Sequence, residues 1–191
     1  MNSYYDYLYT KKLDIDLTSI RTGSEMMYNV VMNHFIHDQP TNQWYDLPTT
    51  SAYGNYNCFL YPFPGMHELY VNLRDFYRSL VTTNEPAYVQ CWINVFNKGE
   101  FIDWHTHSDK GLELWHGLYI VNGEGSHTSY RVDGHTFDIP SEDNLLILGK
   151  SEGDEHKSSE WNKDTPRVTI AFDIVPAKNI HSFELNHWVP I

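Results

Sequence analysis

The sequence predicts a mainly β protein with helices at its N-terminus, an α+β arrangement. Short apolar runs rich in β-branched and aromatic residues recur after Pro86 and are separated by turn residues. Before residue 82, two segments instead carry apolar residues at helical spacing. Several short strands joined by regular turns indicate a sandwich, a barrel or a jelly roll. A length of 191 residues suits one domain.

Two helices are expected before the β region. Residues 13–17 alternate like a short strand, and 25–37 is predicted to be an amphipathic helix with Ser24 as its N-cap. A clearer apolar stripe predicts a helix over 66–81. Between the two helices, 38–56 is rich in turn residues and aromatic side chains, so it is expected to be a long loop and is the candidate substrate lid.

The second half of the chain is predicted to be β structure. Strands are expected at 88–96, 117–122, 127–132, 135–139, 144–149 and 167–175. The sequences Asn122-Gly123-Glu124-Gly125 and Asp133-Gly134 are typical of hairpin turns. We therefore expect helices first and a β core second.

Composition argues against some classes of partner and indicates the cellular location. The formal net charge is -12, from 13 Lys and Arg against 25 Asp and Glu, which argues against duplex nucleic acid or an anionic membrane as partner. Cys58 and Cys91 are too few for a disulfide scaffold, so they are interpreted as reduced core residues. The opening residues lack a signal-peptide pattern and no apolar stretch approaches a membrane span, so a cytoplasmic protein is expected.

The segment from Gly99 to His107 carries the main chemical signal. His105 and His107 follow the apolar run 89–96, and residues two apart in an extended chain point to the same face. Two imidazoles on one face form half of a metal site. The pair alone is a weak signal in a chain with 11 histidines.

Two further residues strengthen the signal. His156 precedes the last predicted strand, and in a double-stranded β-helix such a position lies near the end of the first strand. Three ligands on one face with open positions opposite suit Fe(II) and oxygen chemistry. Arg167 and Thr169 share one face of the last strand and would present a planar fork and a hydroxyl to a carboxylate. Taken singly, His156 and Arg167 would be interpreted as surface residues.

In order and spacing, residues 89–175 resemble the Fe(II)- and 2-oxoglutarate-dependent oxygenases of the prolyl-hydroxylase-like group found in phage and bacterial genomes. The matching features are Gly99, His105 and His107, the strand Gly117-Leu118-Tyr119-Ile120-Val121, the turn Gly123-Glu124-Gly125, His156, and Arg167-Val168-Thr169. The resemblance implies a double-stranded β-helix, a cupin-like jelly roll, flanked by two or more helices. We therefore expect a single domain, 1–191, with a helical and loop support region at 1–86, the β core at 87–178 and a C-terminal extension at 179–191.

The resemblance also implies an activity. Such an enzyme couples decarboxylation of 2-oxoglutarate to oxidation of a substrate C–H bond by O2, with hydroxylation as the default outcome and ascorbate as a candidate reductant. The implied Fe(II) ligands, which form the catalytic centre, are His105, His107 and His156. The implied 2-oxoglutarate contacts are Arg167 and Thr169, with Tyr119 and Asn94 as further candidates. The expected substrate is a small molecule, a protein or a peptide.

The match departs from the group's commonest pattern at one ligand. The second ligand is most often Asp, whereas this sequence has His107 there. Asp109 is the alternative, although its spacing from Gly99 differs by two. Three neutral imidazoles would leave Fe(II) with its double charge, which a 2-oxoglutarate dianion could balance.

Two other interpretations remain open. A cupin would use His105 and His107 with Glu113 as a nearby third ligand, but it gives Arg167 no role. A metal-free jelly-roll binding or structural module would leave the histidines as surface residues. The remaining histidines of the β half, His116, His127 and His135, are interpreted as sheet or surface residues. Substrate identity and oligomeric state are not predicted from the sequence.

Overall fold

The protein is described by a computed structural model in which residues 2–4, 7–36, 47–107, 112–132, 134–151, 154–182 and 187–191 are placed. The strands are β1 Asn2–Tyr4, β2 Leu8–Lys12, β3 Ala87–Phe96, β4 Leu114–Asn122, β5 His127–Val132, β6 His135–Pro140, β7 Leu145–Ser151, β8 Glu155–Ser158, β9 Arg167–Pro176 and β10 Val189–Pro190. The helices are α1 Leu17–His34, α2 Pro48–Ser51 and α3 Met66–Leu80, with short 3-10 turns at Tyr53–Asn55, Cys58–Leu60 and Ala177–Ser182.

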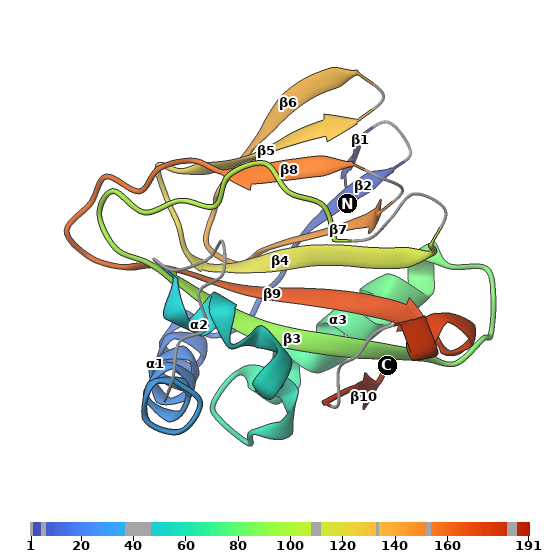
Figure 1. Cartoon of the computed structure of the whole chain (residues 1–191), viewed down its shortest axis with the longest axis horizontal. Coiled ribbons are helices and arrows are strands. Elements are labelled where there is room, and N and C mark those ends of the chain that lie inside the picture. The colour runs from blue at the N-terminus through green and yellow to red at the C-terminus, as the bar shows by residue number, and fades with distance from the viewer. Residues whose placement is uncertain are drawn as a thin grey trace.

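Two antiparallel sheets form the core of the fold (Figure 1). The larger has the strand order β1-β2-β7-β4-β9-β3-β10, and the smaller has the order β6-β5-β8. From β3 onward the chain passes repeatedly between the two sheets, so that neighbouring strands such as β4, β9 and β3 are not consecutive in sequence. This is the predicted jelly roll, and the predicted mainly β architecture with N-terminal helices is confirmed.

The helices cover the face of the larger sheet that points away from the smaller sheet (Figure 1). Alternation along β9 sends Ile170 and Phe172 toward the helices, where they are fully buried with Leu69 and Leu73 of α3. The apolar stripe predicted for 66–81 is therefore a packing surface. The opposite face of β9 is left to line the space between the sheets.

The start of α1 differs from the prediction. The helix begins at Leu17 because Asp16 is its N-cap and accepts a hydrogen bond from the Ser19 amide at 2.7 Å. Ser24 lies inside the helix, where its hydroxyl donates to the Ile20 carbonyl at 2.8 Å. The alternation at 13–17 was thus misread as a strand, and the strand is β2, which ends at Lys12.

Both ends of the chain add strands to the larger sheet. β2 pairs with β7, and β10 pairs with β3. The region before residue 87 therefore supplies the edge strand β1 and its neighbour β2 as well as the helices. Of the predicted loop 38–56, residues 38–46 lie outside the described residues, and 47–56 contain α2 and the first 3-10 turn.

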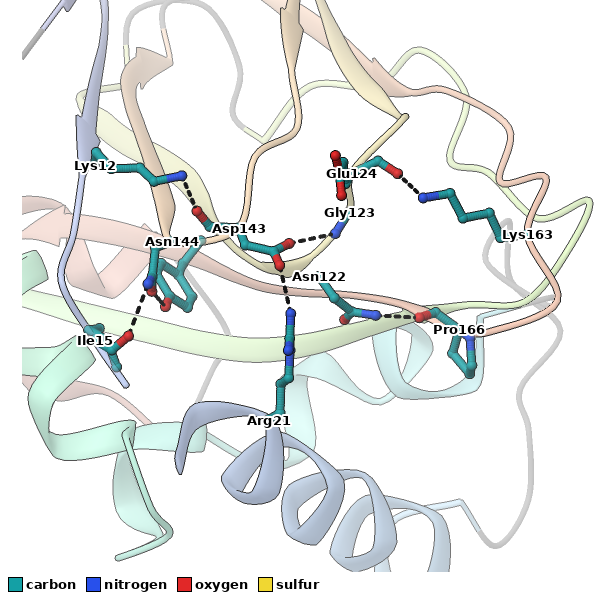
Figure 2. A network of polar contacts seen from close by, with 11 residues as sticks. Lys12, Ile15, Arg21, Asn122, Gly123, Glu124, Asp143, Asn144, Lys163 and Pro166 are labelled. Atoms are coloured by element: carbon teal, nitrogen blue, oxygen red, sulfur yellow. Dashed lines mark hydrogen bonds and ion pairs between the residues drawn. The ribbon is translucent and has the colours of Figure 1, made fainter. Parts of the chain in front are cut away.

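A polar network ties the N-terminal segments to the β core (Figure 2). Asp143 lies between β6 and β7, where its carboxylate accepts a hydrogen bond from Arg21 of α1 at 2.6 Å and one from the Gly123 amide at 3.3 Å. The next residue, Asn144, has a positive φ of 65° and donates to the Ile15 carbonyl at 2.9 Å. These contacts fix the entry of α1 against the β4–β5 and β6–β7 connections.

Cys58 and Cys91 are buried in the core as free thiols. Among the placed residues, no helix has both the length and the apolar character that a membrane crossing requires.

Candidate active site

A cavity of about 210 Å³ lies between the two sheets. Four residues of β9 line it at alternate positions, namely Arg167, Thr169, Ala171 and Asp173. Side chains at i and i+2 of a strand share a face, so the sequence pattern of β9 sets this lining directly. Histidines from other segments complete the wall.

His105 and His156 meet through a β-bridge that connects the segment after β3 to β8. The His105 amide donates to the His156 carbonyl at 3.1 Å, and the His156 amide donates to the His105 carbonyl at 3.0 Å. The two ring centroids are 4.2 Å apart. The backbone pairing therefore holds the two imidazoles on the same side.

His107 completes a cluster with these two histidines. Its ring centroid lies 5.3 Å from that of His105 and 4.9 Å from that of His156. The three residues each offer a ring nitrogen, and these nitrogens lie within 4.8 Å of one another. The structure thus brings together the three residues predicted as metal ligands, and their donor set suits a borderline divalent cation such as Fe(II).

Hydrogen bonds orient two of the rings. Nδ1 of His105 lies 2.8 Å from the Asp103 carbonyl, and Nδ1 of His107 lies 2.6 Å from Oδ1 of Asp173. Carbonyl and carboxylate oxygens only accept, so both Nδ1 atoms carry the proton. Nε2 of each ring is then the atom with a lone pair for a metal.

The pKa values favour neutral imidazoles at two of the three positions. Burial, together with the neighbouring His107, lowers the pKa of His105 to about 4. Burial and the surrounding histidines hold the pKa of His156 well below its usual range. At His107 burial acts in the same direction, but Asp173 outweighs it and the pKa is raised. Neutral imidazole is the form that coordinates a metal.

Arg167 places an unsatisfied cation in the same cavity. Its side chain is 1% exposed, and its guanidinium carbon lies 4.8 Å from the centre of the Phe96 ring. Its Nε and Nη1 are buried and have no hydrogen-bond partner among the described residues. Burial lowers its pKa to about 10, so it stays protonated at neutral pH. A buried guanidinium with unused donors fits a carboxylate ligand.

Two of the other predicted contacts lie beside Arg167. Asn94 and Thr169 face one another across β3 and β9, with 3.5 Å between Asn94 Nδ2 and Thr169 Oγ1. Thr50 of α2 donates to Asn94 Oδ1 at 2.6 Å and also lines the cavity. Tyr119 is not brought into this group, because its hydroxyl donates to Asn144 Oδ1 and its ring lies in the helix-side core.

Neither a protein-family model nor a curated protein matches this sequence. Solved structures do match. A prolyl-4-hydroxylase from Pseudomonas putida is similar with a TM-score of 0.60 and 10% identity, over 88% of this chain and 92% of that one. The viral collagen prolyl hydroxylase of Paramecium Bursaria Chlorella virus-1, solved as a 2OG complex, gives a TM-score of 0.57 and 11% identity, over 88% of this chain and 95% of that one.

A third structure has a different chemistry. The non-heme alpha ketoglutarate dependent carbocyclase SnoK from nogalamycin biosynthesis matches with a TM-score of 0.60 and 10% identity, over 97% of this chain and 88% of that one. This chain has the fold of the 2-oxoglutarate- and Fe(II)-dependent oxygenases. Because hydroxylases and a carbocyclase share the 2-oxoglutarate oxygenase fold, the fold alone does not fix the reaction.

The sequence interpretation missed His116. It is 2% exposed, lines the cavity, and has its ring centroid 4.9 Å from that of His107. Its Nε2 lies 2.9 Å from Oδ2 of Asp154, and His116, Asp154 and His156 form a second group of possible metal ligands that shares His156 with the first. His116 is a hydrogen-bonded sheet residue, which agrees with the prediction, but the prediction gave it no place in the cavity wall. Its strand begins at Leu114 and not at 117, and alternation from 114 would have placed His116 beside Leu118 on the cavity face.

Of the two alternative ligands of the sequence analysis, the structure describes Glu113, and this residue does not join the cluster. Glu113, the third ligand of the cupin interpretation, is exposed and pairs with Lys178 at 2.7 Å. Asp109 lies outside the described residues. His127, half-buried in β5, and His135, exposed in β6, agree with the prediction of sheet or surface residues. Among the described residues, the histidines that line the cavity are therefore the three predicted ligands together with His116.

Proposed function

We propose that this protein is an Fe(II)- and 2-oxoglutarate-dependent dioxygenase that oxidises a C–H bond of a small molecule or a peptide, with hydroxylation as the outcome. One observation carries the proposal: three convergent imidazoles and a buried guanidinium with unused donors line a single cavity. The fold, which the chain shares with 2-oxoglutarate-dependent oxygenases, supports the same assignment.

The residues fit the metal and the co-substrate. His105, His107 and His156 would hold Fe(II), which leaves adjacent positions for a bidentate keto acid and O2. The bound iron would supply the oxygen chemistry, in which 2-oxoglutarate, O2 and the substrate are converted to succinate, CO2 and the hydroxylated substrate. The charge of a 2-oxoglutarate dianion would balance the double charge of the ion.

Arg167 would bind the carboxylate of 2-oxoglutarate that lies away from the metal. Its fork of N–H donors matches a carboxylate, and the apolar Phe96 ring beside it strengthens such a bond by excluding water. Thr169, next to it on the same face of β9, would donate its hydroxyl to the same group. Asn94 and Thr50 would hold Thr169 in place.

The test separates the metal site from the co-substrate site. Freshly purified protein would be loaded anaerobically with Fe(II), and 2-oxoglutarate added while the visible charge-transfer absorption of the chelate is followed. Oxygen-dependent succinate formation would then be measured. We expect absorption and succinate from the wild type, neither from His105→Ala, and Fe(II) binding without the absorption from Arg167→Met.

Arg74→Met is the matched control, since Arg74 is an exposed arginine of α3 that pairs with Asp75. It should behave as the wild type. Absence of near-stoichiometric binding of iron, manganese or zinc by the wild type would favour a metal-free jelly-roll module. Normal 2-oxoglutarate turnover by Arg167→Met would overturn the role given to the guanidinium.

A further inference from the structure

The three candidate ligands have different hydrogen-bond partners. His105 donates to a neutral backbone carbonyl of Asp103, at 2.8 Å. His156 has a buried Nδ1 without a hydrogen-bond partner among the described residues. His107 donates to the carboxylate of Asp173, at 2.6 Å. Of these contacts, the hydrogen bond from His107 to Asp173 is the one that connects a ligand to a negatively charged group.

Among the residues that the structure describes, the ion pair of Asp173 is the one with His107. Asp173 is 8% exposed and lies on the cavity face of β9. Arg167 is on the same face but six residues earlier, which is about 20 Å along an extended strand at roughly 3.3 Å per residue. The other buried carboxylate near the cluster, Asp154, is bonded to His116 at 2.9 Å.

A set of three neutral imidazoles gives a divalent ion no ligand charge. In a buried cavity this is costly, because a charge that has left water needs a compensating partner. A carboxylate bonded to the far nitrogen of a ligating histidine makes the near nitrogen a stronger donor and fixes its direction. Asp173 and His107 have this arrangement, with the proton held on Nδ1 and the lone pair on Nε2.

We propose that Asp173 is a positioning residue that supplies, through His107, the negative charge that the all-histidine ligand set lacks. The inference rests on the proposed function, since it concerns the metal held by His105, His107 and His156. It assigns a role to a carboxylate that does not itself coordinate the ion. The strand β9 then carries both charged ends of the site, with Arg167 for the co-substrate and Asp173 for the metal.

Two substitutions separate charge from hydrogen bonding. Asp173→Asn keeps the shape and an oxygen that accepts from Nδ1, but it removes the charge. Asp173→Ala removes both. We expect the dissociation constant for Fe(II), and for Co(II) as a spectroscopic probe, to rise about tenfold in Asp173→Asn and up to about a hundredfold in Asp173→Ala. Asp164→Asn, at a side chain 90% exposed, is the matched control and should leave the constant unchanged.

A second measurement does not depend on the metal. In metal-free protein with ¹⁵N-labelled histidine, we expect the His107 Nδ1–H signal to show a strong hydrogen bond in the wild type, a weaker one in Asp173→Asn and none in Asp173→Ala. Circular dichroism of the same samples checks that each variant is folded.

The outcomes distinguish the inference from the proposed function. A wild type that binds no divalent metal overturns both. A wild type that binds metal, beside an Asp173→Asn variant that binds it equally well, overturns the role of Asp173 and leaves the proposed function intact. A loss of affinity in Asp173→Asn and a larger loss in Asp173→Ala, with the order of NMR signals given above, support the inference.

Discussion

The main chains of His105 and His156 exchange two hydrogen bonds, with N···O distances of 3.1 and 3.0 Å. This pairing holds two imidazoles from distant parts of the chain with their centroids 4.2 Å apart. The arrangement of the ligands is therefore set by backbone pairing between β8 and the segment after β3, and substitutions of the side chains should remove ligands without displacing the backbone.

The structure offers two ligand groups that share His156, and substitution can decide between them. We expect His105→Ala and His156→Ala to lose near-stoichiometric metal, and His116→Ala to retain it. Metal content after dialysis, measured by elemental analysis, checks this. Retention by His105→Ala with loss in His116→Ala would place the ion at His116, Asp154 and His156.

Arg167 carries a buried charge with unused donors, so its removal should stabilise the ligand-free protein. We expect Arg167→Met to raise the free energy of unfolding by about 1 kcal/mol. The increase is no larger because the substitution also removes the contact between the guanidinium and Phe96. That corresponds to a melting temperature about 2 to 4 °C higher for a chain of this size. Scanning calorimetry of ligand-free protein measures it, and a lower melting temperature would show that the guanidinium is satisfied.

Acid should destabilise the metal-free protein through His105. Its pKa is lowered from 6.5 to about 4, so between these values the unfolded chain binds a proton that the folded chain does not. The contribution of His105 to the free energy of unfolding is fully present above pH 6.5 and is lost as the pH falls toward 4. The loss is at most about 3 kcal/mol. Urea unfolding of chelated wild type and His105→Asn at several pH values measures the difference, and parallel curves would contradict it.

Asp143 should contribute more to stability than an ordinary surface carboxylate, because it joins Arg21 to the Gly123 amide. We expect Asp143→Ala to lose about 1 to 2 kcal/mol of unfolding free energy. Asp164→Ala, which removes an exposed pair with Lys98, should change it by less than about 0.5 kcal/mol. Urea denaturation compares the two, and equal losses would mean that the network of Figure 2 adds nothing to the fold.

Much of the β core was predictable because its strands have regular patterns. The alternation of Arg167 and Thr169 identified one face of β9, and the turns around Gly123 and Gly134 separated the strands β4, β5 and β6. The convergence of His105 and His107 followed from the same period of two. That His156 lies beside them could be predicted only from the topology of the fold, and the order of the motifs indicated that topology.

The errors arose where local signals competed. Asp16 and Ser24 are both good N-caps, and the structure shows that α1 starts after the earlier one, where Ile20 of the first turn is buried in the core. The segment 155–158 is polar and is not among the predicted strands, yet it forms β8 because His105 and β5 provide backbone partners. His116 and Asp173 were missed as site residues because each needs a partner from a distant segment.

The contact between His107 and Asp173 joins a segment paired with the smaller sheet to a strand of the larger one. An ion held at His105, His107 and His156 would therefore fasten β8 to the segment after β3, and through the contact between His107 and Asp173 it would also connect the smaller sheet to the larger one. Chelation should then let the layers separate more often, and the amides of β5 and β8 would exchange their hydrogens with solvent faster than those of β3 and β9.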